Sequence, residues 1–478
     1  FATGGSDWKH DLGFMSRDHE CDWNTPFQHF DRSIKPMGAL CDEHRKVTSL
    51  TIQTIGLEGS VPSELKLIRG LKTLSLDRNQ LDNMEGIKEL HQVEELTLGY
   101  NMFVQEIPTW LGGMSNLRTL GLSDNAFTST IPAEMSGMTQ LTTLLLDNNK
   151  LSGNLTVVED MPTLREVFLE GNDFTEVLSD DFLANLHNLE VLDLSNNNLE
   201  GYLSGNLLRK PALRYLDLNY NNLEGVLPDI PLATSLTSLS LHDNFFEGGV
   251  PSSIRNLVNL QHFDVSNNRM DGTFPNSIRE LSNLQYLFLA GNNHIQQGPF
   301  PDFIRPLSNL KELSLQATAR TGTIPDWISS LSNLVLLDVS RNRFNSSIPA
   351  LVGKLSELEY LLLNRNELTG WVPHQFIHLK KLRMLLLDQN SLTGSVESSV
   401  CKLRGVSVLM ADCDEVQCTC CSRCCQDSDE DDGSGSCDDE TVLSTSYDPM
   451  WENQFMRPAF NYSADVLFVM PRASIIEP

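Results

Sequence analysis

The sequence predicts an α/β solenoid, a right-handed superhelix in which each repeat adds one strand to a long parallel sheet on its concave side. An eleven-residue phrase, L-x-x-L-x-L-x-x-N-x-L, recurs from about residue 47 to about residue 416, as in 189–199, 213–223 and 382–392. Its spacing averages about 24 residues, a period typical of stacked repeat units. The cysteines gather at the two ends of this array. Together these features indicate a capped solenoid.

Each phrase predicts one strand followed by one turn. In the x-L-x-L-x part, alternate residues face opposite sides of a strand. We expect the leucines to stack inward on those of the adjacent coil and the intervening residues to face solvent on the concave surface. The following asparagine, such as Asn197 or Asn342, is expected to bond backbone groups that the turn leaves unpaired. The later G-x-I-P, as in 322–325, and leucines three residues apart favour a short 3₁₀ or α turn on the convex side.

About sixteen repeats are predicted, with phrases beginning at 47, 71, 93, 117, 141, 164, 189, 213, 236, 260, 284, 310, 334, 358, 382 and 406. Some depart from the pattern. Position nine is Ile55 in the first repeat and Thr318 in the twelfth, and the repeats beginning at 71, 141, 164 and 189 lack Ile-Pro. The eleventh repeat carries extra residues near His294–Pro299. Insertions in solenoids map to loops and sometimes to binding faces, although drift in a tolerant loop is the plainer explanation.

Four segments follow from this organisation. We predict an N-terminal cap over 1–46, the solenoid over 47–416, a Cys-rich C-terminal cap over 401–437 with an acidic loop at 427–440, and an aromatic tail over 441–478. The first coil of a solenoid has an apolar face that no preceding repeat covers. We therefore expect a Cys21–Cys41 disulfide in the N-terminal cap, with Trp8 and Trp23 on the first coil.

An even number of cysteines at the ends of the array indicates disulfides formed in an oxidising, extracellular compartment. The expected disulfide residues are Cys21, Cys41, Cys401, Cys413, Cys418, Cys420, Cys421, Cys424, Cys425 and Cys437. The pairing of the last eight stays open. The C-x-x-C at 421–424 could instead suggest zinc or redox chemistry, but structural disulfides are favoured. Three glycosylation sequons, at Asn154, Asn345 and Asn461, also fit a secreted or cell-surface glycoprotein.

The net charge of −28 argues against nucleic acid and anionic membrane surfaces as partners, because both need clustered Lys and Arg. The acidic loop begins like a calcium loop at Asp427, Asp429 and Asp431, but Asp432 and Asp438 stand where the motif needs Gly and Glu. Weak calcium binding is the remaining alternative; no metal site or cofactor is predicted.

Membrane insertion by this segment is not expected. The longest apolar run near the end, 466–470, is far below the ~20 residues that a spanning helix needs. The chain begins at Phe1 rather than Met, which favours a processed or partial product and leaves an upstream signal or anchor open.

The concave face contains two candidate surfaces, at phrase positions three, five and eight. An interrupted acidic column is predicted at position five, comprising Asp193, Asp217, Asp264 and Asp338. An apolar, partner-binding area is predicted towards the C-terminal end, comprising Tyr286, Phe288, Leu336, Tyr360, Leu362, Met384 and Leu386, with Arg341 and Arg365 at its border. Exposed apolar patches tend to mark contact surfaces, and aromatic and Arg side chains are favoured anchors. The alternatives are cover by the chain's own C-terminal tail, or no role.

The phrase L-x-G-x-I-P resembles the plant-specific class of leucine-rich repeats found in receptor ectodomains and inhibitor proteins. The N-terminal C-x-W, the second Cys and V-T-S-L resemble the N-terminal cap of that class. The opening A-T-G-G-S-D-W and the later M-A-D-C-D-E-V-Q-C-T-C-C are closer to the leucine-rich repeat proteins of stramenopile algae such as diatoms. The resemblance covers about residues 1–425. It implies a leucine-rich repeat superhelix with disulfide-bearing caps, but a fold does not name a ligand.

Catalysis finds no support in the sequence, since it holds no phosphate loop, G-x-S-x-G or H-E-x-x-H. We therefore expect a non-catalytic extracellular module that recognises a protein or peptide on its concave face. One alternative is a structural subunit of a cell coat, wall or filament, whose partners would be copies of itself or other subunits. Another is an inhibitor of a secreted enzyme.

Overall fold

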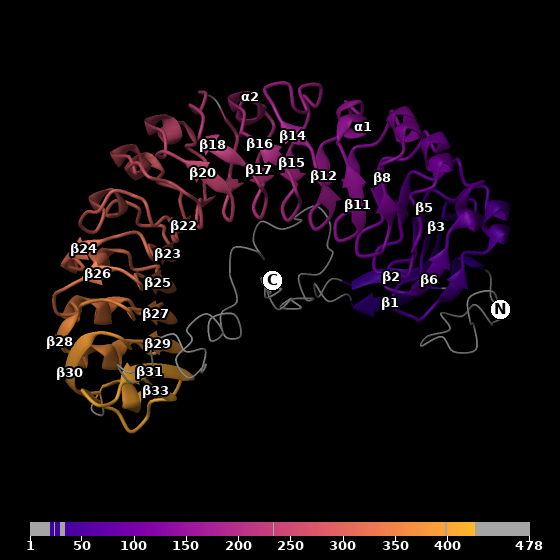
Figure 1. Ribbon diagram of the computed structural model, residues 1–478. Helices are drawn as coiled ribbons and strands as arrows, with labels where there is room; N and C mark the ends of the chain where they lie inside the picture. The colour runs from indigo at the N-terminus through magenta and orange to yellow at the C-terminus, as the bar shows by residue number, and fades with distance from the viewer. Residues whose placement is uncertain (1–19, 23, 29–33, 233, 397–398, 426–478) are drawn as a thin grey trace. The chain divides into compact units, whose positions relative to one another are not determined.

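The computed structural model describes residues 20–22, 24–28, 34–232, 234–396 and 399–425. They fall into two compact units that meet in the sequence at Leu223 and Glu224. Within each unit one strand per repeat joins a parallel sheet, and short turns lie on the other side of the coil (Figure 1). The predicted leucine-rich repeat solenoid is confirmed.

In the first unit, an antiparallel hairpin precedes the parallel sheet. β1 (Asn24–Gln28) pairs with β2 (Ile34–Cys41), which pairs antiparallel with the first repeat strand. The repeat strands then pair in parallel in chain order. They are β3 (Val47–Thr51), β5 (Thr73–Ser75), β7 (Glu95–Thr97), β8 (Thr119–Gly121), β10 (Thr143–Leu145), β12 (Glu166–Phe168), β15 (Val191–Asp193) and β17 (Tyr215–Asp217).

Away from this sheet, the first unit carries short strand pairs and single helical turns. The strands are β4 (Glu58–Ser60), β6 (Gln80–Asn83), β9 (Thr128–Ser129), β11 (Lys150–Gly153), β13 (Asp173–Phe174), β14 (Val177–Leu178) and β16 (Glu200–Gly201). The 3₁₀ turns are η2 (Glu20–Asp22), η3 (Ser63–Leu67), η4 (Glu85–Ile87), η5 (Thr109–Gly113) and η6 (Ala133–Gly137). Two repeats without Ile-Pro form α turns instead, α1 (Thr156–Glu159) and α2 (Gly205–Leu208).

The second unit repeats this arrangement. Its sheet strands pair in parallel throughout. They are β19 (Ser238–Ser240), β21 (His262–Asp264), β22 (Tyr286–Phe288), β23 (Glu312–Ser314), β25 (Leu336–Asp338), β27 (Tyr360–Leu362), β29 (Met384–Leu386), β31 (Val408–Asp412) and β33 (Arg423–Cys425).

The outer strands of the second unit are β18 (Glu224–Val226), β20 (Phe245–Glu247), β24 (Thr321–Gly322), β26 (Arg343–Phe344), β28 (Thr369–Trp371), β30 (Ser391–Ser395) and β32 (Val416–Gln417). Its 3₁₀ turns are η7 (Ser252–Asn256), η8 (Asn276–Glu280), η9 (Asp302–Ile304), η10 (Asp326–Ser330), η11 (Ala350–Lys354), η12 (His374–His378) and η13 (Val400–Lys402). From η7 to η12 a proline stands directly before the turn. Proline is tolerated there because its fixed φ suits the extended residue that enters a helical turn.

The core is a stack of leucines, as the phrase predicts. Leu337, Leu361 and Leu385 occupy the same position on three neighbouring strands and are fully buried. The asparagine of the phrase also performs its expected task. Asn366 donates from Nδ2 to the carbonyls of Val339 and Leu363, at 3.0 and 3.1 Å, and its Oδ1 accepts from the backbone N–H of Phe344. Each such asparagine therefore joins two consecutive coils.

Disulfides close both ends. The expected Cys21–Cys41 bond is present. At the C-terminal end the pairs are Cys401–Cys420, Cys413–Cys424 and Cys418–Cys421, and Cys425 is disulfide-bonded as well. None of the described cysteines is free. The expected positions of Trp8 and Trp23, the acidic loop 427–440 and the tail 441–478 lie outside the described residues.

Candidate functional site

The predicted apolar area lies on the sheet face, which we define as the face carrying phrase positions three and five. Strand pairing places Leu336, Tyr360 and Met384 side by side, and Leu362 next to Leu386. These residues form the apolar cluster, whose members are Leu336, Tyr360, Leu362, Met384, Leu386, Met410 and Cys425. The predicted alignment across the strands that begin at 336, 360 and 384 is confirmed.

The predicted solvent exposure of this area is wrong. Members of the apolar cluster are at most 5% exposed, and Leu386 and Met410 are fully buried. In-register pairing is one physical reason, because it sets each apolar side chain beside another and removes apolar area from water on both flanks. All of these members belong to the sheet itself. The alternative in which residues 441–478 cover them lies outside the described residues.

Tyr286 and Phe288 are separate from the apolar cluster and form a pair of their own. Strand β23 lies between the two groups and presents Glu312 and Ser314 at the corresponding positions. His262 on β21 meets both rings edge to face, with centroid distances of 6.3 Å to Tyr286 and 6.0 Å to Phe288. The predicted apolar residues thus occupy two patches rather than one.

Burial sets the ionisation of these aromatic groups. It lowers the pKa of His262 to about 3, aided by His242, so the imidazole is neutral at ordinary pH, and its Nδ1 lies 2.9 Å from Ser238 Oγ. Burial and the Glu312 carboxylate raise the pKa of Tyr286 to about 12. The Lys311 ammonium lies 5.6 Å from the centre of the Tyr286 ring, within cation–π range.

The border of two arginines predicted from their phrase position stays a prediction. Arg341 and Arg365 are half-buried, and both adopt positive φ, 53° and 55°. A third arginine escaped the sequence analysis. Arg383 Nη1 donates to the Tyr360 hydroxyl at 3.3 Å and lies 3.5 Å from Glu359 Oε2. Arg383 reaches Tyr360 because β27 pairs with β29. A contact between two repeats cannot be read from one phrase alone.

The acidic column is only partly continuous. Asp193 and Asp217 are neighbours on β15 and β17 in the first unit. Asp264 and Asp338 lie in the second unit on β21 and β25, with β22 and β23 between them. The interruption predicted from the sequence is confirmed.

These aspartates also have a local structural task that the sequence analysis missed. Each accepts a hydrogen bond from the backbone N–H two residues later, an Asx-type turn that closes the strand. The distances are 3.1 Å for Asp193, 3.0 Å for Asp217, 2.8 Å for Asp264 and 3.0 Å for Asp338. The recurring D-x-S or D-x-N was the sequence signal for it.

The electrostatics of the Asp193–Asp217 pair reflect its burial. Burial and the Asp217 carboxylate raise the pKa of Asp193 to about 7, although hydrogen bonds from Ser195 oppose the shift. The Tyr215 hydroxyl donates to Asp217 at 3.1 Å, and burial with the nearby carboxylates raises the pKa of that phenol. The pair therefore holds less negative charge than two exposed aspartates would.

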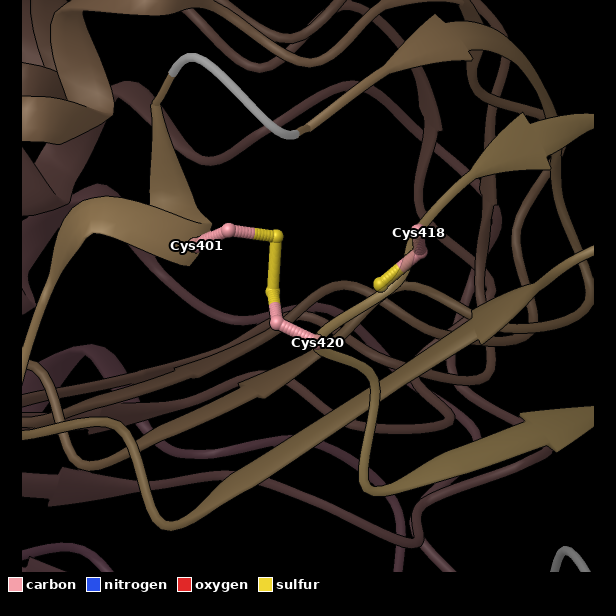
Figure 2. Close-up of side chains that lie close together, drawn as sticks. All are labelled: Cys401, Cys418 and Cys420. Carbon is pink, nitrogen blue, oxygen red and sulfur yellow. A yellow bond between two sulfur atoms is a disulfide. The ribbon is translucent and has the colours of Figure 1, made fainter.

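The C-terminal cap contains the one group of potential metal ligands found among the described residues. The sulfur atoms of Cys401, Cys418 and Cys420 lie within 4.8 Å of one another (Figure 2). Zinc is bound by thiolates. All three sulfurs are already in disulfides, Cys401–Cys420 and Cys418–Cys421. The group is therefore a covalent clamp on the last coils.

Two of the three predicted glycosylation sites lie in the part of the chain that the structure describes. Asn154 and Asn345 are exposed, as a glycan acceptor must be. Asn461 lies outside the described residues. Glycosylation at the three sites stays a prediction.

Comparison with known proteins agrees with the fold. A family model described as leucine rich repeat matches residues 105–151, 162–223, 234–295 and 346–392. The chain is 28% identical over 177 residues to Receptor-like protein 39 of Arabidopsis thaliana, a match that covers 36% of this chain and 20% of that protein. Across the described ranges, no helix is both long and apolar enough to cross a membrane.

Solved structures give the same result. The plant peptide hormone receptor RGFR1 in complex with RGF2 is 27% identical, with a TM-score of 0.66 over 77% of this chain and 59% of the receptor chain. The ectodomain of the Arabidopsis thaliana membrane receptor kinase GASSHO1/SCHENGEN3, in complex with CASPARIAN STRIP INTEGRITY FACTOR 2, is 32% identical, with a TM-score of 0.67 over 76% of this chain and 47% of that chain. The chain is therefore a leucine-rich repeat solenoid that is similar to plant receptor ectodomains. The chain spans about a fifth of the curated relative and roughly half of these receptor chains.

Proposed function

We propose that the chain is an extracellular, non-catalytic module that binds a peptide or protein on the sheet face of its second unit. The observation that carries the proposal is the likeness to receptor ectodomains solved in complex with a peptide hormone or integrity factor. The disulfides at both ends support an oxidising, extracellular location. These likenesses favour neither a structural subunit nor an enzyme inhibitor.

The apolar cluster is the surface that we assign to the ligand. It combines an aromatic ring, aliphatic and thioether side chains and bordering guanidinium groups, the composition of interface anchors. Its members are at most 5% exposed, so a ligand can bind only when this surface becomes accessible. Any cover by the chain's own tail would compete with the ligand for this surface. We also propose that the chain resembles the extracellular leucine-rich repeat proteins of stramenopile algae such as diatoms, on the motifs A-T-G-G-S-D-W and M-A-D-C-D-E-V-Q-C-T-C-C.

The test is a selection of peptides from a displayed random library against the full chain and against a chain ending at residue 440. Peptides enriched on either protein are then measured against the double variant Tyr360→Asp/Leu362→Asp. We expect binding to fall at least about tenfold, because each lost anchor removes on the order of 1–2 kcal/mol. Stronger binding by the shortened chain would identify tail cover.

Trp371→Asp is the matched control, since this side chain is 76% exposed and lies on outer strand β28. Because Leu362 is buried, the milder Tyr360→Ala/Leu362→Ala variant is measured beside the first, and thermal unfolding checks that each variant folds. Failure to enrich any peptide, or equal binding by the folded double variants, would contradict the proposal.

A further inference from the structure

A pocket of about 250 Å³ lies in the second unit, away from the sheet face. Its walls include Phe274, Gln297, Phe300, Asp302 and Arg320. Most of the lining comes from the long eleventh repeat, through its inserted residues and η9. The rest comes from the segment that leads into η8 and from the end of the twelfth phrase. The inserted residues Gln296, Gln297 and Pro299 thus form part of the lining of an open pocket.

Arg320 occupies a position that the three following repeats use for the core. It is residue eleven of its phrase, where the following repeats place Phe344, Leu368 and Leu392, all at most 1% exposed. Arg320 itself is 7% exposed. A buried charge is costly unless it is paired and hydrogen-bonded, so this substitution needs a physical compensation.

Neutral carbonyl groups provide only part of that compensation. Arg320 Nε donates to the Thr318 carbonyl at 2.7 Å, and Nη2 donates to the Gln296 carbonyl at 2.5 Å. No described carboxylate forms an ion pair with this guanidinium, and its burial lowers its pKa. Arg320 lines the pocket. A guanidinium has five N–H donors in a fixed fork, and these two bonds use only two of them.

The insertion and the arginine form one structural unit. Gly298 forms a parallel bridge with Arg320, and its carbonyl accepts from the Thr321 N–H at 2.9 Å. A β-carbon at Gly298 would lie 3.4 Å from Arg320 Nη1, so glycine leaves this side of the fork uncrowded. The two departures from the repeat pattern therefore meet at the same place.

We propose that this pocket binds a small monocarboxylate that carries an apolar group. The Arg320 fork matches the two oxygens of a carboxylate, and Phe274 and Phe300 provide an apolar wall. The volume is below the ~300–1,000 Å³ of sites that enclose drug-sized ligands, which suits one ring or a short chain. The exposed Asp302 carboxylate at the rim disfavours anions of higher charge. The carboxylate belongs either to a free small acid or to the last residue of a peptide.

The experiment titrates the full chain with sodium benzoate by calorimetry, and with benzyl alcohol and sodium phosphate in parallel. Benzoate should bind, while the other two compounds should bind at least about tenfold more weakly, since a charge-assisted pair contributes on the order of 1.5–3 kcal/mol. N-acetylphenylalanine and its amide separate the two sources. If the ligand is the C-terminal residue of a peptide, N-acetylphenylalanine binds more tightly than benzoate. If the ligand is a free small acid, benzoate binds more tightly than N-acetylphenylalanine.

Arg320→Leu is the decisive variant, because it introduces the residue type found at this position in the repeats that begin at 358 and 382, and it should fold. It should lose benzoate binding by at least about tenfold while its thermal transition stays or rises. Arg343→Leu, at an exposed position of the next phrase, is the matched control and should bind as the wild type does. Asp302→Asn should tighten binding. Absence of benzoate binding to the wild type, or equal binding by folded Arg320→Leu, overturns the proposal.

Discussion

The phrases 310–320 and 334–344 are consecutive coils of the same solenoid, yet they end in opposite ways. Their strands are equivalent, and Leu313 and Leu337 are both fully buried. The second phrase ends on Phe344, whose ring lies 6.0 Å from that of Phe300. The first ends on Arg320 above a pocket. The strand part of a repeat therefore anchors the coil, and the end of the phrase can change from core to candidate site.

The irregular phrase depends on its regular neighbour. Thr318 replaces the usual asparagine and retains one of its bonds, from Oγ1 to the Leu315 carbonyl at 2.6 Å. Asn342 Oδ1 accepts from the backbone N–H groups of Thr318 and Arg320, at 3.2 and 2.9 Å. Asn342 of the following coil thus fixes the backbone that carries Arg320. We call the stack of equivalent asparagines in successive coils the asparagine ladder.

Placing an arginine at the end of the second phrase should give the largest loss of stability. We expect Phe344→Arg to destabilise the second unit by about 4 kcal/mol or more, because it removes a buried ring and inserts a charge at a fully buried position. Urea unfolding followed by fluorescence measures the change. Glu367→Arg, at an exposed site, should change stability little. A loss below about 1 kcal/mol for Phe344→Arg would mean that any coil tolerates the charge.

Removing the link between the two phrases should have an intermediate effect. Asn342→Ala deletes donors to the Leu315 and Val339 carbonyls, at 2.8 and 3.1 Å, and leaves buried backbone groups without partners. We expect a loss of about 2–3 kcal/mol in unfolding free energy, together with weaker benzoate binding. Asn333→Ala removes one exposed bond to the Ser308 carbonyl and should cost less than about 1 kcal/mol. Equal losses from the two variants would show that the ladder is not a special support.

The smallest expected effect concerns position five, where phrases 189–199 and 213–223 both carry aspartate. The folded-state pKa of Asp193 is raised from the ordinary 3.8 to about 7, so the native state keeps a proton that the unfolded chain releases. The resulting stability is present below about pH 4 and is lost as pH rises towards 8.

Asp193→Asn keeps the site neutral and should remove this decline. Relative to the wild type, the variant should gain on the order of 1–3 kcal/mol between pH 4 and pH 8, measured by urea unfolding at each pH. Asp173→Asn, at an exposed carboxylate of the same unit, is the control. A stability difference that does not change with pH would contradict the shifted pKa.

Much of this organisation could be predicted from the sequence. The repeat period, the inward leucines, the bonding of asparagines such as Asn366 and the Cys21–Cys41 bond all follow from local pattern. The pairing of Cys401 with Cys420 could not be predicted from the sequence, because several nearby cysteines could equally well have been the partner of Cys401. The candidate pocket could not be predicted either. The charged residue Arg320, at a phrase position that is usually apolar, was the one indication of it in the sequence.

The sequence by itself determined the coil, because one phrase dictates which side chains turn inward and where the chain turns back. Only the tertiary structure decided the surroundings of the residues between the leucines. Tyr360 and Leu362 could be placed on one face from their spacing, but their burial depends on what lies against that face. The role that we propose for Arg320 depends on the insertion in the preceding coil, whose Gly298 pairs with Arg320. Contacts between coils join residues about one repeat apart, and a single phrase carries no information about its neighbour.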